Sequence, residues 1–303
     1  MTPPLVVSVI LNTNRREDTL ACLATLAAND YPHHRIIVLD NASTDGSVAA
    51  IGHAYPDVRI IQLSANLGYA GNNNVGIAAA LEMGADWVWV LNEDTIFAPD
   101  CLSRLMEAAT TDPAVGVLGP MVYHHAAPGV IQSAGGMLGP RWDSIMLGRD
   151  EPDSGQFAAP HDVEWIMGCA ILVRREVIEQ VGMIDPRYFY FWEETEWCIR
   201  AARAGWRIVH VPAAKMWHKG VTPDFAPKPS ITYYATRNRL LTLSKHHAPA
   251  RVKAHVWASN VRTLASWSIK PRWRAMSPHR DALWHGMRDF MRRRWGPMPT
   301  APR

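Results

Sequence analysis

Short apolar runs alternate with segments of helical spacing along the first 120 residues. Buried strands are predicted at 5–12, 35–40, 58–63, 86–91 and 115–118. Helices are predicted at 18–28, from Ser43 onward, at 69–83, and at 99–110 with a proline in its first turn. This alternation is typical of βαβ units, so we expect an α/β fold with a doubly wound, mostly parallel, Rossmann-like sheet.

The pattern changes at Pro120. Residues 121–162 are rich in Gly, Pro and His, which favours loops and short antiparallel strands. Beyond them we predict strands at 163–173 and 206–211 and helices at 175–181, 194–204 and 231–246. The chain therefore divides into residues 1–120, residues 121–247 and a C-terminal helical extension, residues 248–303.

Composition limits the class of protein. The chain has 303 residues, 48% of them apolar, which suffices for one large α/β domain and a tail. It has no apolar run of the length of a membrane span, and its start has no basic n-region of a signal peptide. The four cysteines form no CxxC pair. We expect reduced, packed cysteines and a cytoplasmic location.

The charge is unevenly distributed. Residues 1–250 hold 19 Lys and Arg against 26 Asp and Glu, whereas residues 251–303 hold 12 against 2. Trp284, Met287, Met291 and Trp295 form one helical stripe in this tail. A basic helix with such a stripe can lie on an anionic membrane, here the inner face of the cell membrane; the alternative is a helix docked on the catalytic domain. No recognition motif indicates nucleic acid.

Polar clusters follow three of the predicted strands, at residues 13–15, 40–47 and 92–94. Ligands of open α/β sheets bind at these strand ends. Asp40 could accept a hydrogen bond from the imide N–H of uracil or thymine; alternatively, Asp40 or Ser43 caps the next helix. Asp94 could bind a divalent cation, although Asn-Glu-Asp is also a common turn.

The segment NLGYAGNNNVGI is a glycine-rich turn that runs into a helix. Gly68 and Gly71 permit close backbone approach, either to an anionic ligand at the helix start or simply within a loop. The sequence has neither the GxxxxGK[ST] phosphate loop nor the GxGxxG dinucleotide fingerprint.

Seven segments in order resemble the family 2 glycosyltransferases, in particular their bacterial rhamnosyltransferase-like branch. They are SVILNTNR, VLDNASTDGS, NLGYAGNNNVGI, VLNEDT, GCAILVRREVIEQVGMIDPRYFYFWEETEWCIRAARAGW, VPAAKMWHKG and YYATRNRLL. The resemblance covers about residues 6–245. It implies the GT-A fold and an inverting transfer of a sugar from a nucleoside-diphosphate donor.

The resemblance also implies roles for single residues. Thr13 and Asp40 match positions that hold the nucleobase, and Asp94 and Asn92 match the ends of the metal motif. His218 matches a histidine that completes the metal shell, for Mg²⁺ or Mn²⁺; without the family context it would be a packing or surface residue. The predicted nucleotide-sugar site is completed by Asn14, Asn41, Gly71, Asn74, Glu93 and Arg237.

FWEETEWCIR matches the EDxDL segment that carries the catalytic base in the family. Glu194 aligns with the base and Glu193 is the second candidate; glutamates replace both aspartates of the motif. Acids at a helix start also interact favourably with the helix dipole. Arg237 and Asn238 are predicted to reach the pyrophosphate.

On the acceptor side we expect Trp165, Gly168 and Trp192, within an aromatic-rich region that includes 188–192. Plain core packing is the alternative for these aromatic residues.

These features predict a metal-dependent, inverting glycosyltransferase that acts on a glycan or lipid-linked acceptor in cell-surface polysaccharide synthesis, with a dTDP- or UDP-sugar, most plausibly dTDP-rhamnose, as donor. A sugar-1-phosphate nucleotidyltransferase is the second enzymatic hypothesis, although its GxGxRxxxLT-like loop is absent from the early chain. A sugar-binding protein of this fold that has lost catalysis is the third. The oligomeric state does not follow from the sequence.

Overall fold

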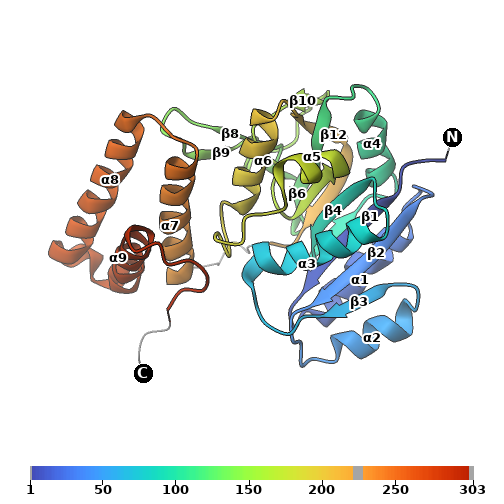
Figure 1. Ribbon diagram of the computed structural model, residues 1–303, viewed down its shortest axis with the longest axis horizontal. Coiled ribbons are helices and arrows are strands. Elements are labelled where there is room, and N and C mark those ends of the chain that lie inside the picture. Colours follow the sequence, from blue (N-terminus) through green and yellow to red (C-terminus); the bar gives the residue numbers. More distant parts are fainter. Residues whose placement is uncertain (1, 221–227, 300–303) are drawn as a thin grey trace.

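The computed structural model describes residues 2–220 and 228–299. Strand and helix alternate through the first part of the chain, as predicted (Figure 1). These elements are β1 (Val6–Asn12), α1 (Arg16–Ala27), β2 (His34–Asp40), α2 (Ser47–Ala54), β3 (Arg59–Gln62), α3 (Gly68–Glu82), β4 (Trp87–Asn92), β5 (Thr95–Phe97), α4 (Cys101–Ala109) and β6 (Val115–His124).

The next part of the chain contains short strands and two helices before a long strand closes the sheet. Its elements are β7 (Ala127–Ser133), β8 (Gly136–Leu138), β9 (Ser144–Met146), β10 (His161–Asp162), β11 (Ala170–Arg174), α5 (Arg175–Val181), α6 (Glu193–Arg203) and β12 (Arg207–His218). The predicted mixture of loops and short antiparallel strands at 121–162 is confirmed, since β6 pairs antiparallel with β7 and β8 with β9.

The main sheet has the strand order β10-β12-β6-β11-β4-β1-β2-β3. β3, β2, β1 and β4 are parallel, and β6 and β12 run parallel to each other. β11 lies antiparallel between β4 and β6. Because β4 and β6 are both opposed to β11, six of the eight strands along this path point the same way, and their carboxyl ends share one edge of the sheet.

Apolar side chains fill both faces of the sheet. One cluster lies under α1, α2 and α4 and includes Leu23 and Trp89, and the other lies under α3, α5 and α6 and includes Ile77 and Trp197. Strands buried on both faces explain why their sequences are continuous apolar runs rather than alternating ones. The four cysteines are buried and free, as predicted.

A group of helices follows, formed by α7 (Pro229–Lys245), α8 (Ala250–Ile269), the 3₁₀ helix η1 (Pro271–Met276) and α9 (Ser277–Met291). α9 packs along α7, and Leu240, Val256 and Leu283 belong to a separate small core (Figure 1). The helical extension is therefore organised around α7, which lies before residue 248. Among the residues described, none of the helices is both long enough and apolar enough to cross a membrane.

The predicted stripe in the tail is divided by this packing. Met287 is 3% exposed and lies against α7, whereas Trp284 is 45% and Met291 54% exposed. The stripe therefore does not form a single free face, and α9 itself is a docked helix.

Some element limits differ from those predicted. Ser43 does not open a helix: α2 begins at Ser47, after Gly46 adopts a left-handed φ of 82°. Pro99 precedes α4 instead of lying in its first turn. Of the strand predicted at 163–173, only the last part forms a strand, β11, because the chain between the end of β10 at Asp162 and the start of β11 turns Trp165 into the core beside Gly136.

Candidate active site

The carboxyl ends of β1, β2 and β4 lie side by side. In the parallel register Asn12 is paired with Asp40, and Leu11 is paired with Asn92. The three polar clusters that follow these strands therefore border one region of the surface, where open α/β sheets bind their ligands.

Asp40 is held rigidly at this edge. It is 3% exposed, its Oδ1 accepts a hydrogen bond from the Asn12 side-chain amide at 2.8 Å, and its Oδ2 accepts one from the Ser43 backbone N–H at 3.0 Å. Neither Asp40 nor Ser43 caps α2. The helix-cap alternative is therefore wrong, and the two bonds fix the carboxylate beside the end of β1.

Two exposed loops meet above Asp40. The Asn14 side-chain oxygen accepts a hydrogen bond from the Thr44 N–H at 2.8 Å, with Asn14 in the left-handed region at φ 52°. Asn41 donates to the Thr13 hydroxyl at 3.3 Å. Thr13 and Asn14 are exposed, and Asn41 is half-buried. The predicted nucleobase residues thus lie on one surface. Asn12, which supports them, was missed; its place as the last residue of β1 was the available signal.

Asp94 and His218 are brought together from distant parts of the chain. β12 pairs with β5, so His218 at the end of β12 is paired with Thr95, next to Asp94. The distance between His218 Nε2 and Asp94 Oδ1 is 3.1 Å, and the backbone N–H of Gly220 donates to Asp94 Oδ2 at 3.2 Å. A carboxylate oxygen and an imidazole nitrogen therefore face each other.

Gln132 on β7 orients this imidazole. Its side-chain oxygen lies 2.8 Å from His218 Nδ1, and it is 7% exposed. An amide oxygen can only accept, so Nδ1 donates to Gln132 and Nε2 is the nitrogen that faces Asp94. Metal-binding histidines are commonly oriented in this way by a second hydrogen bond. The sequence pattern carried no signal for Gln132.

The two carboxyls that follow β4, Glu93 and Asp94, have pKa values shifted in opposite directions. Burial acts to raise the pKa of Asp94, but the hydrogen bond from His218 and its charge outweigh it and hold the pKa below its ordinary value. Burial and the neighbouring Asp94 raise the pKa of Glu93 to about 7. No group of three or more His, Cys, Asp or Glu residues that could hold a metal occurs in the described parts of the chain. The role of Asp94 and His218 as ligands of a cation, whose other ligands would be phosphate oxygens and water, stays a prediction.

The second acidic pair begins α6. Glu194 is half-buried, and it lies against Gly168, where an added Cβ would be 3.7 Å from its Cβ and Cγ. The Tyr69 hydroxyl donates to the Gly168 carbonyl at 2.5 Å. Burial raises the pKa of Glu194 to about 7. A carboxylate with this pKa is suited to act as a general base near neutral pH.

Glu193 has a different environment. It is 4% exposed, and its Oε2 has no hydrogen-bond partner among the described residues. Burial, followed by repulsion from Glu194, raises its pKa well above the ordinary value. Glu193 is therefore the carboxyl of the pair that stays neutral, while Glu194 reaches solvent.

Tyr190 links the two acidic pairs. Burial raises its pKa, and the next contributions come from Glu193 and Glu194, then from Asp94 and Glu93. A single hydroxyl is thus within electrostatic reach of both pairs, while the residue remains 45% exposed. The backbone supplies the geometric link, since the Asn92 N–H donates to the Cys169 carbonyl at 3.0 Å and the preceding residue, Gly168, lies against Glu194. The two pairs are therefore neighbours, and Tyr190 is a candidate site residue that the sequence indicated only as part of an aromatic run.

Arg237 cannot contact a pyrophosphate in this structure. It is 0% exposed, and its guanidinium donates to the backbone carbonyls of Tyr188 at 2.9 Å and Gly296 at 2.7 Å. Asn238 is also fully buried. The prediction for these two residues is wrong because both side chains are used inside the protein.

Two further predictions are changed by burial. Asn74 binds the backbone of Ile184 with both ends of its amide, at 2.7 and 3.1 Å, so it has a structural role. Trp165 is 3% exposed and packs in the core, as the alternative for it stated. Gly168 and Trp192 flank Glu194, and their contact with an acceptor stays a prediction.

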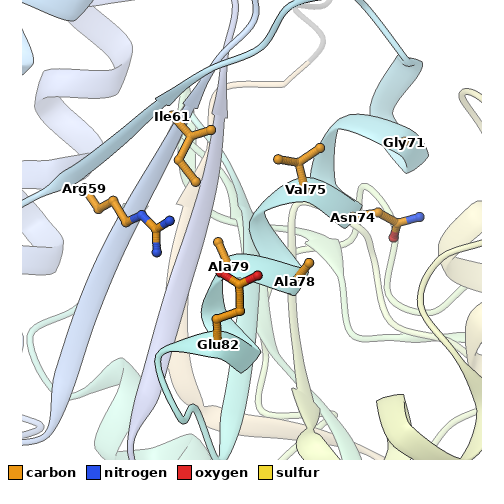
Figure 2. A pocket seen from close by; sticks show the side chains of 8 residues that line it. All are labelled: Arg59, Ile61, Gly71, Asn74, Val75, Ala78, Ala79 and Glu82. Atoms are coloured by element: carbon orange, nitrogen blue, oxygen red, sulfur yellow. The ribbon is translucent and has the colours of Figure 1, made fainter.

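A shallow groove between β3 and α3 lies apart from the acidic pairs. Figure 2 shows Val75 and Ala79 of α3 on the side of Arg59 and Ile61 of β3, while the amide of Asn74, another lining residue, points away from β3. The groove contains neither Asp94 nor Glu194. Gly71 allows Leu67 to approach closely, since an added Cβ would be 2.6 Å from the Leu67 Cβ; its contact with the donor stays a prediction.

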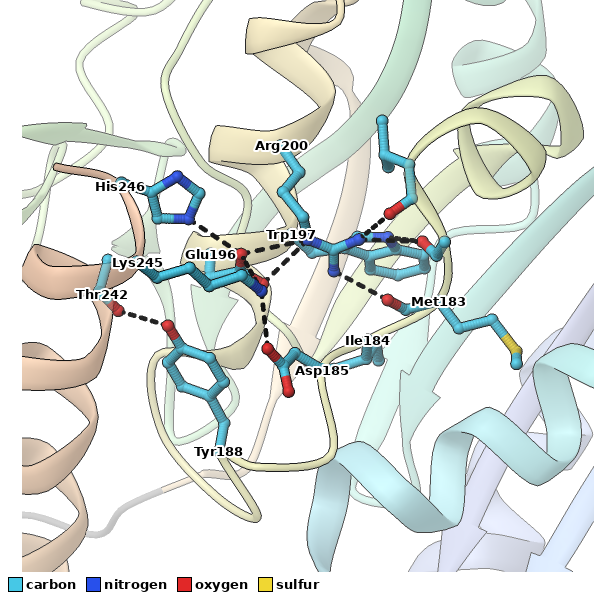
Figure 3. A network of polar contacts seen from close by, with 12 residues as sticks. Met183, Ile184, Asp185, Tyr188, Glu196, Trp197, Arg200, Thr242, Lys245 and His246 are labelled. Carbon is cyan, nitrogen blue, oxygen red and sulfur yellow. Dashed lines mark hydrogen bonds and ion pairs between the residues drawn. The ribbon is translucent and has the colours of Figure 1, made fainter. Parts of the chain in front are cut away.

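The helix that carries Glu194 is anchored by buried charges. Glu196 is 0% exposed and lies 3.0 Å from Arg200, 2.8 Å from Lys245 and 2.9 Å from His246 (Figure 3). Lys245 and His246 come from the end of α7. Glu196, the last acid of the EETE segment, therefore fastens α6 to the C-terminal helices and is fully buried.

Comparisons with solved structures agree with this architecture. A mannosyltransferase from Pyrobaculum calidifontis, in complex with GDP-Man and Mn²⁺, superposes with a TM-score of 0.60 at 14% identity over 96% of this chain and 88% of that chain. Staphylococcus aureus TarS superposes with a TM-score of 0.59 at 16% identity over 94% and 80%. At these identities the likeness shows the fold, and the GT-A prediction is confirmed.

Sequence comparison identifies the family. Residues 8–182 match the profile described as glycosyl transferase family 2. An N-acetylglucosaminyl-diphospho-decaprenol L-rhamnosyltransferase of Mycobacterium tuberculosis is 36% identical over 216 residues, 65% of this chain and 70% of the relative. A dTDP-rhamnosyl transferase of Shigella flexneri is 26% identical over 206 residues, 63% and 65%. Together with the acidic pairs at the end of β4 and the start of α6, these matches show that the chain belongs to glycosyl transferase family 2 and is a glycosyltransferase of the rhamnosyltransferase-like branch.

Proposed function

We propose that this enzyme transfers a rhamnosyl group from dTDP-rhamnose to a hydroxyl of a lipid-linked or glycan acceptor, with inversion, in the synthesis of a cell-surface polysaccharide. The observation that carries the proposal is that the two acidic pairs are neighbours, because the end of β4 is hydrogen-bonded from Asn92 to Cys169, next to the Gly168 that lies against Glu194. The names of the two rhamnosyltransferase relatives support the choice of sugar.

The donor is oriented by groups at the ends of β1 and β2. The fixed carboxylate of Asp40 accepts the imide N–H of a pyrimidine base, with Thr13 and Asn41 beside it. These contacts are made equally in the ground state and the transition state, so they contribute to affinity rather than to turnover.

Asp94 and the Nε2 of His218 would hold a divalent cation, Mg²⁺ or Mn²⁺. A bound cation neutralises the negative charge that grows on the departing nucleoside diphosphate. Gln132 keeps Nε2 free for this role, and the backbone N–H of Gly220 keeps the Asp94 carboxylate oriented.

Glu194 removes the proton of the acceptor hydroxyl. As the hydroxyl oxygen forms a bond to the anomeric carbon, the bond from that carbon to the diphosphate oxygen breaks, and its electron pair leaves with the nucleoside diphosphate. The proton goes to the Glu194 carboxylate. A single displacement of this kind inverts the anomeric centre and needs no second carboxylate as nucleophile.

A donor panel tests the proposal. The purified enzyme is incubated with dTDP-rhamnose, UDP-glucose or GDP-mannose and a short-chain lipid diphosphate that carries N-acetylglucosamine, and release of nucleoside diphosphate is measured with Mn²⁺, Mg²⁺ or EDTA. We expect the fastest release from dTDP-rhamnose with a cation, and an NMR spectrum that shows the opposite anomeric configuration in the product.

Three results would contradict parts of this account. Turnover that persists in saturating EDTA removes the metal role. Retention of configuration removes the single displacement. The absence of transfer from every donor supports a protein that binds sugar without catalysis.

We also propose that the C-terminal helices contact the inner face of an anionic membrane, at a different place from the stripe on α9. Residues 251–280 hold seven Lys and Arg and no acid. At the junction of α8 and η1, Lys270, Arg272 and Arg274 are exposed, and Ile269 is 78% exposed. Each cation near an anionic surface contributes about 1 kcal/mol, and an exposed apolar side chain can insert beside them.

Vesicle flotation tests this contact. A variant with Lys270, Arg272 and Arg274 replaced by Gln is compared with one in which three exposed arginines outside the C-terminal helices, Arg35, Arg59 and Arg149, are replaced by Gln, an equal change of charge. With phosphatidylglycerol vesicles at low salt we expect the first variant to bind at least tenfold more weakly and the second to bind like the wild type. Equal losses in both, or no binding by the wild type, would contradict the proposal.

A further inference from the structure

A strained aromatic loop leads into the helix that carries Glu194. Phe189, Phe191 and Trp192 have φ values of 63°, 69° and 75°, and Trp192 is the residue that precedes α6. Non-glycine residues in this region cost of order 1 kcal/mol or more each, and they persist only where the surroundings enforce them. Some other part of the protein must therefore hold residues 188–192 in place.

Asn238 on α7 supplies the first part of that support. Its side-chain nitrogen donates to the carbonyl oxygens of Tyr188 at 2.8 Å, Tyr190 at 2.7 Å and Phe191 at 2.7 Å. Asn238 is 0% exposed. A single buried amide therefore binds three carbonyls of the loop. One of them belongs to Tyr190, whose pKa is raised in part by both acidic pairs.

Arg237 supplies the second part and connects it to the end of the chain. Its guanidinium donates to the carbonyls of Tyr188 and Gly296, and its Nε donates to the Asn238 side-chain oxygen at 3.0 Å, so it orients the amide that holds the loop. It also lies over the rings of Tyr234 and Trp295. The segment 295–298 therefore supplies part of the surroundings of the Arg237 guanidinium, through the carbonyl of Gly296 and the ring of Trp295.

The loop also touches the donor side of the enzyme. The carbonyl of Phe189 accepts a hydrogen bond from the Ala70 N–H at 3.4 Å, at the start of α3. A Cβ on Gly68 would be 2.4 Å from that carbonyl, and glycine adopts the left-handed φ of 75° at this position without the strain of a side chain. The position of the loop is thus fixed from both sides, by α3 and by α7.

We propose that Asn238 and Arg237 are positioning residues for catalysis, which hold Tyr190 and Glu194 in the reactive arrangement, and that the C-terminal segment 294–299 completes this support. The inference rests on the proposed function through the role of Glu194 as the base. Arg237 and Asn238, which the sequence predicted to contact the donor, would instead act on catalysis indirectly, through residues 188–192. General-base catalysis depends on the distance from the base to the hydroxyl, so displacement of the loop lowers turnover without weakening donor binding.

The test uses Asn238→Leu, which keeps the approximate size of the side chain and removes the donor that binds the three carbonyls. Asn260→Leu is the matched control, since Asn260 lies on α8, where it lines a different pocket together with Asp143 and His255. We measure kcat as a function of pH, the donor Kd by calorimetry, and the melting temperature. Glu194→Gln is measured in the same assays.

For Asn238→Leu we expect kcat to fall about tenfold at neutral pH, with the donor Kd within about twofold of the wild type. The acid limb of kcat, governed by Glu194, should also move to lower pH. Its pKa is raised to about 7 by burial, so a loosened loop that admits water brings the pKa back toward its ordinary value. A residue that merely stabilised the fold would lower the melting temperature without moving this limb.

Deletion of residues 294–303 gives a second variant that leaves Arg237 and Asn238 intact. We expect a fall in kcat of about threefold and a shift of the acid limb in the same direction. If Asn238→Leu does not fold, this deletion decides the question alone. Unchanged kcat and an unchanged acid limb in the folded variants would overturn the inference, provided that Glu194→Gln is inactive. If Glu194→Gln transfers sugar normally, the proposed function has failed instead.

Discussion

At the scale of single residues, burial gives different properties to the two members of each acidic pair. Glu93 has a pKa raised to about 7, whereas that of Asp94 lies below its ordinary value. Glu193 is raised well above the ordinary value, whereas Glu194 reaches about 7. Pairs of carboxyls whose environments separate their pKa values are typical of active sites. One carboxylate of each pair is thus available, which suits a single metal ligand and a single base.

Asp94 is expected to be essential. Asp94→Asn keeps the shape of the side chain and removes the charge that faces His218, so turnover should fall at least tenfold while the melting temperature changes little. The dependence of turnover on Mn²⁺ concentration should move to higher concentration. Asp57→Asn, at an exposed position outside the site, is the control. Wild-type turnover in Asp94→Asn would contradict the predicted metal ligand.

Asp40 should affect affinity more than turnover. Asp40→Ala removes the carboxylate at the end of β2. We expect the donor KM to rise by a larger factor than kcat falls, because the contact with the nucleobase is made in both the ground state and the transition state. Calorimetry with dTDP provides the measurement. Equal dTDP affinity in mutant and wild type would show that Asp40 only ties Asn12 to Ser43.

The sequence predicts residue roles well where position in the sheet decides them. The motif segments and the strand ends place Asp40, Asn92 and Asp94 at one edge. The sequence fails to predict the roles of residues whose function depends on burial. Arg237 resembles a phosphate ligand in a linear motif, yet its guanidinium donates hydrogen bonds to backbone carbonyls inside the protein. Gln132 could not be found because its contact with His218 spans 86 residues of sequence and follows from the pairing of β6 with β7 and β12.

At the scale of elements, α6 is positioned by the ion pairs at Glu196. Burial acts to raise the pKa of Glu196, but the hydrogen bond from His246 and the charges of Arg200 and Lys245 bring it below the ordinary value. A carboxyl with a lowered pKa in the folded state stabilises the fold above its unfolded pKa, and this contribution is lost as the pH falls through the folded value.

Glu196→Gln is therefore expected to lower the free energy of unfolding by about 3 kcal/mol at pH 7, because it leaves buried cations without their partner. The loss relative to the wild type should stay constant down to the ordinary pKa of 4.5 and shrink only as the pH falls below it, toward the lowered folded-state pKa. Urea unfolding at several pH values measures it. Glu179→Gln is the matched control, because its ion pair with Arg175 on α5 is exposed and contributes less than about 1 kcal/mol. Equal losses in both variants would contradict the anchoring role.

Most elements follow from the sequence because their apolar periodicity is strong. β1, β2 and β4 are runs buried on both faces, and no other element type suits them. The start of α2 was missed because Ser43 resembles a cap, whereas Gly46 and Asp45 determine the start, with Asp45 Oδ1 accepting the Ser47 N–H at 3.0 Å. The antiparallel placement of β11 depends on long-range pairing, which a single sequence does not encode locally.

At the scale of the whole molecule, the glycosyltransferase sheet and the C-terminal helices act as one unit. The sheet provides Asp40, Asp94 and His218, and the helices hold the loop and the helix that carry Tyr190 and Glu194. The predicted limits at residues 120 and 247 describe changes in sequence pattern, and their functional meaning stays a prediction. The basic tail was correctly identified as helical, but its packing on α7 follows from contacts that the charge pattern does not show.

The most direct test of the account is the sugar-transfer rate of Glu194→Gln beside that of Glu193→Gln, with donor affinity measured for both. The amide matches the shape of the carboxyl and cannot take a proton, so we expect Glu194→Gln to bind the donor normally and lose most transfer, at least a hundredfold. Glu193→Gln should be milder, since Glu193 is already neutral and buried. An inactive Glu193→Gln with an active Glu194→Gln would reverse the assignment, and normal transfer by both would show that this segment carries no catalytic base.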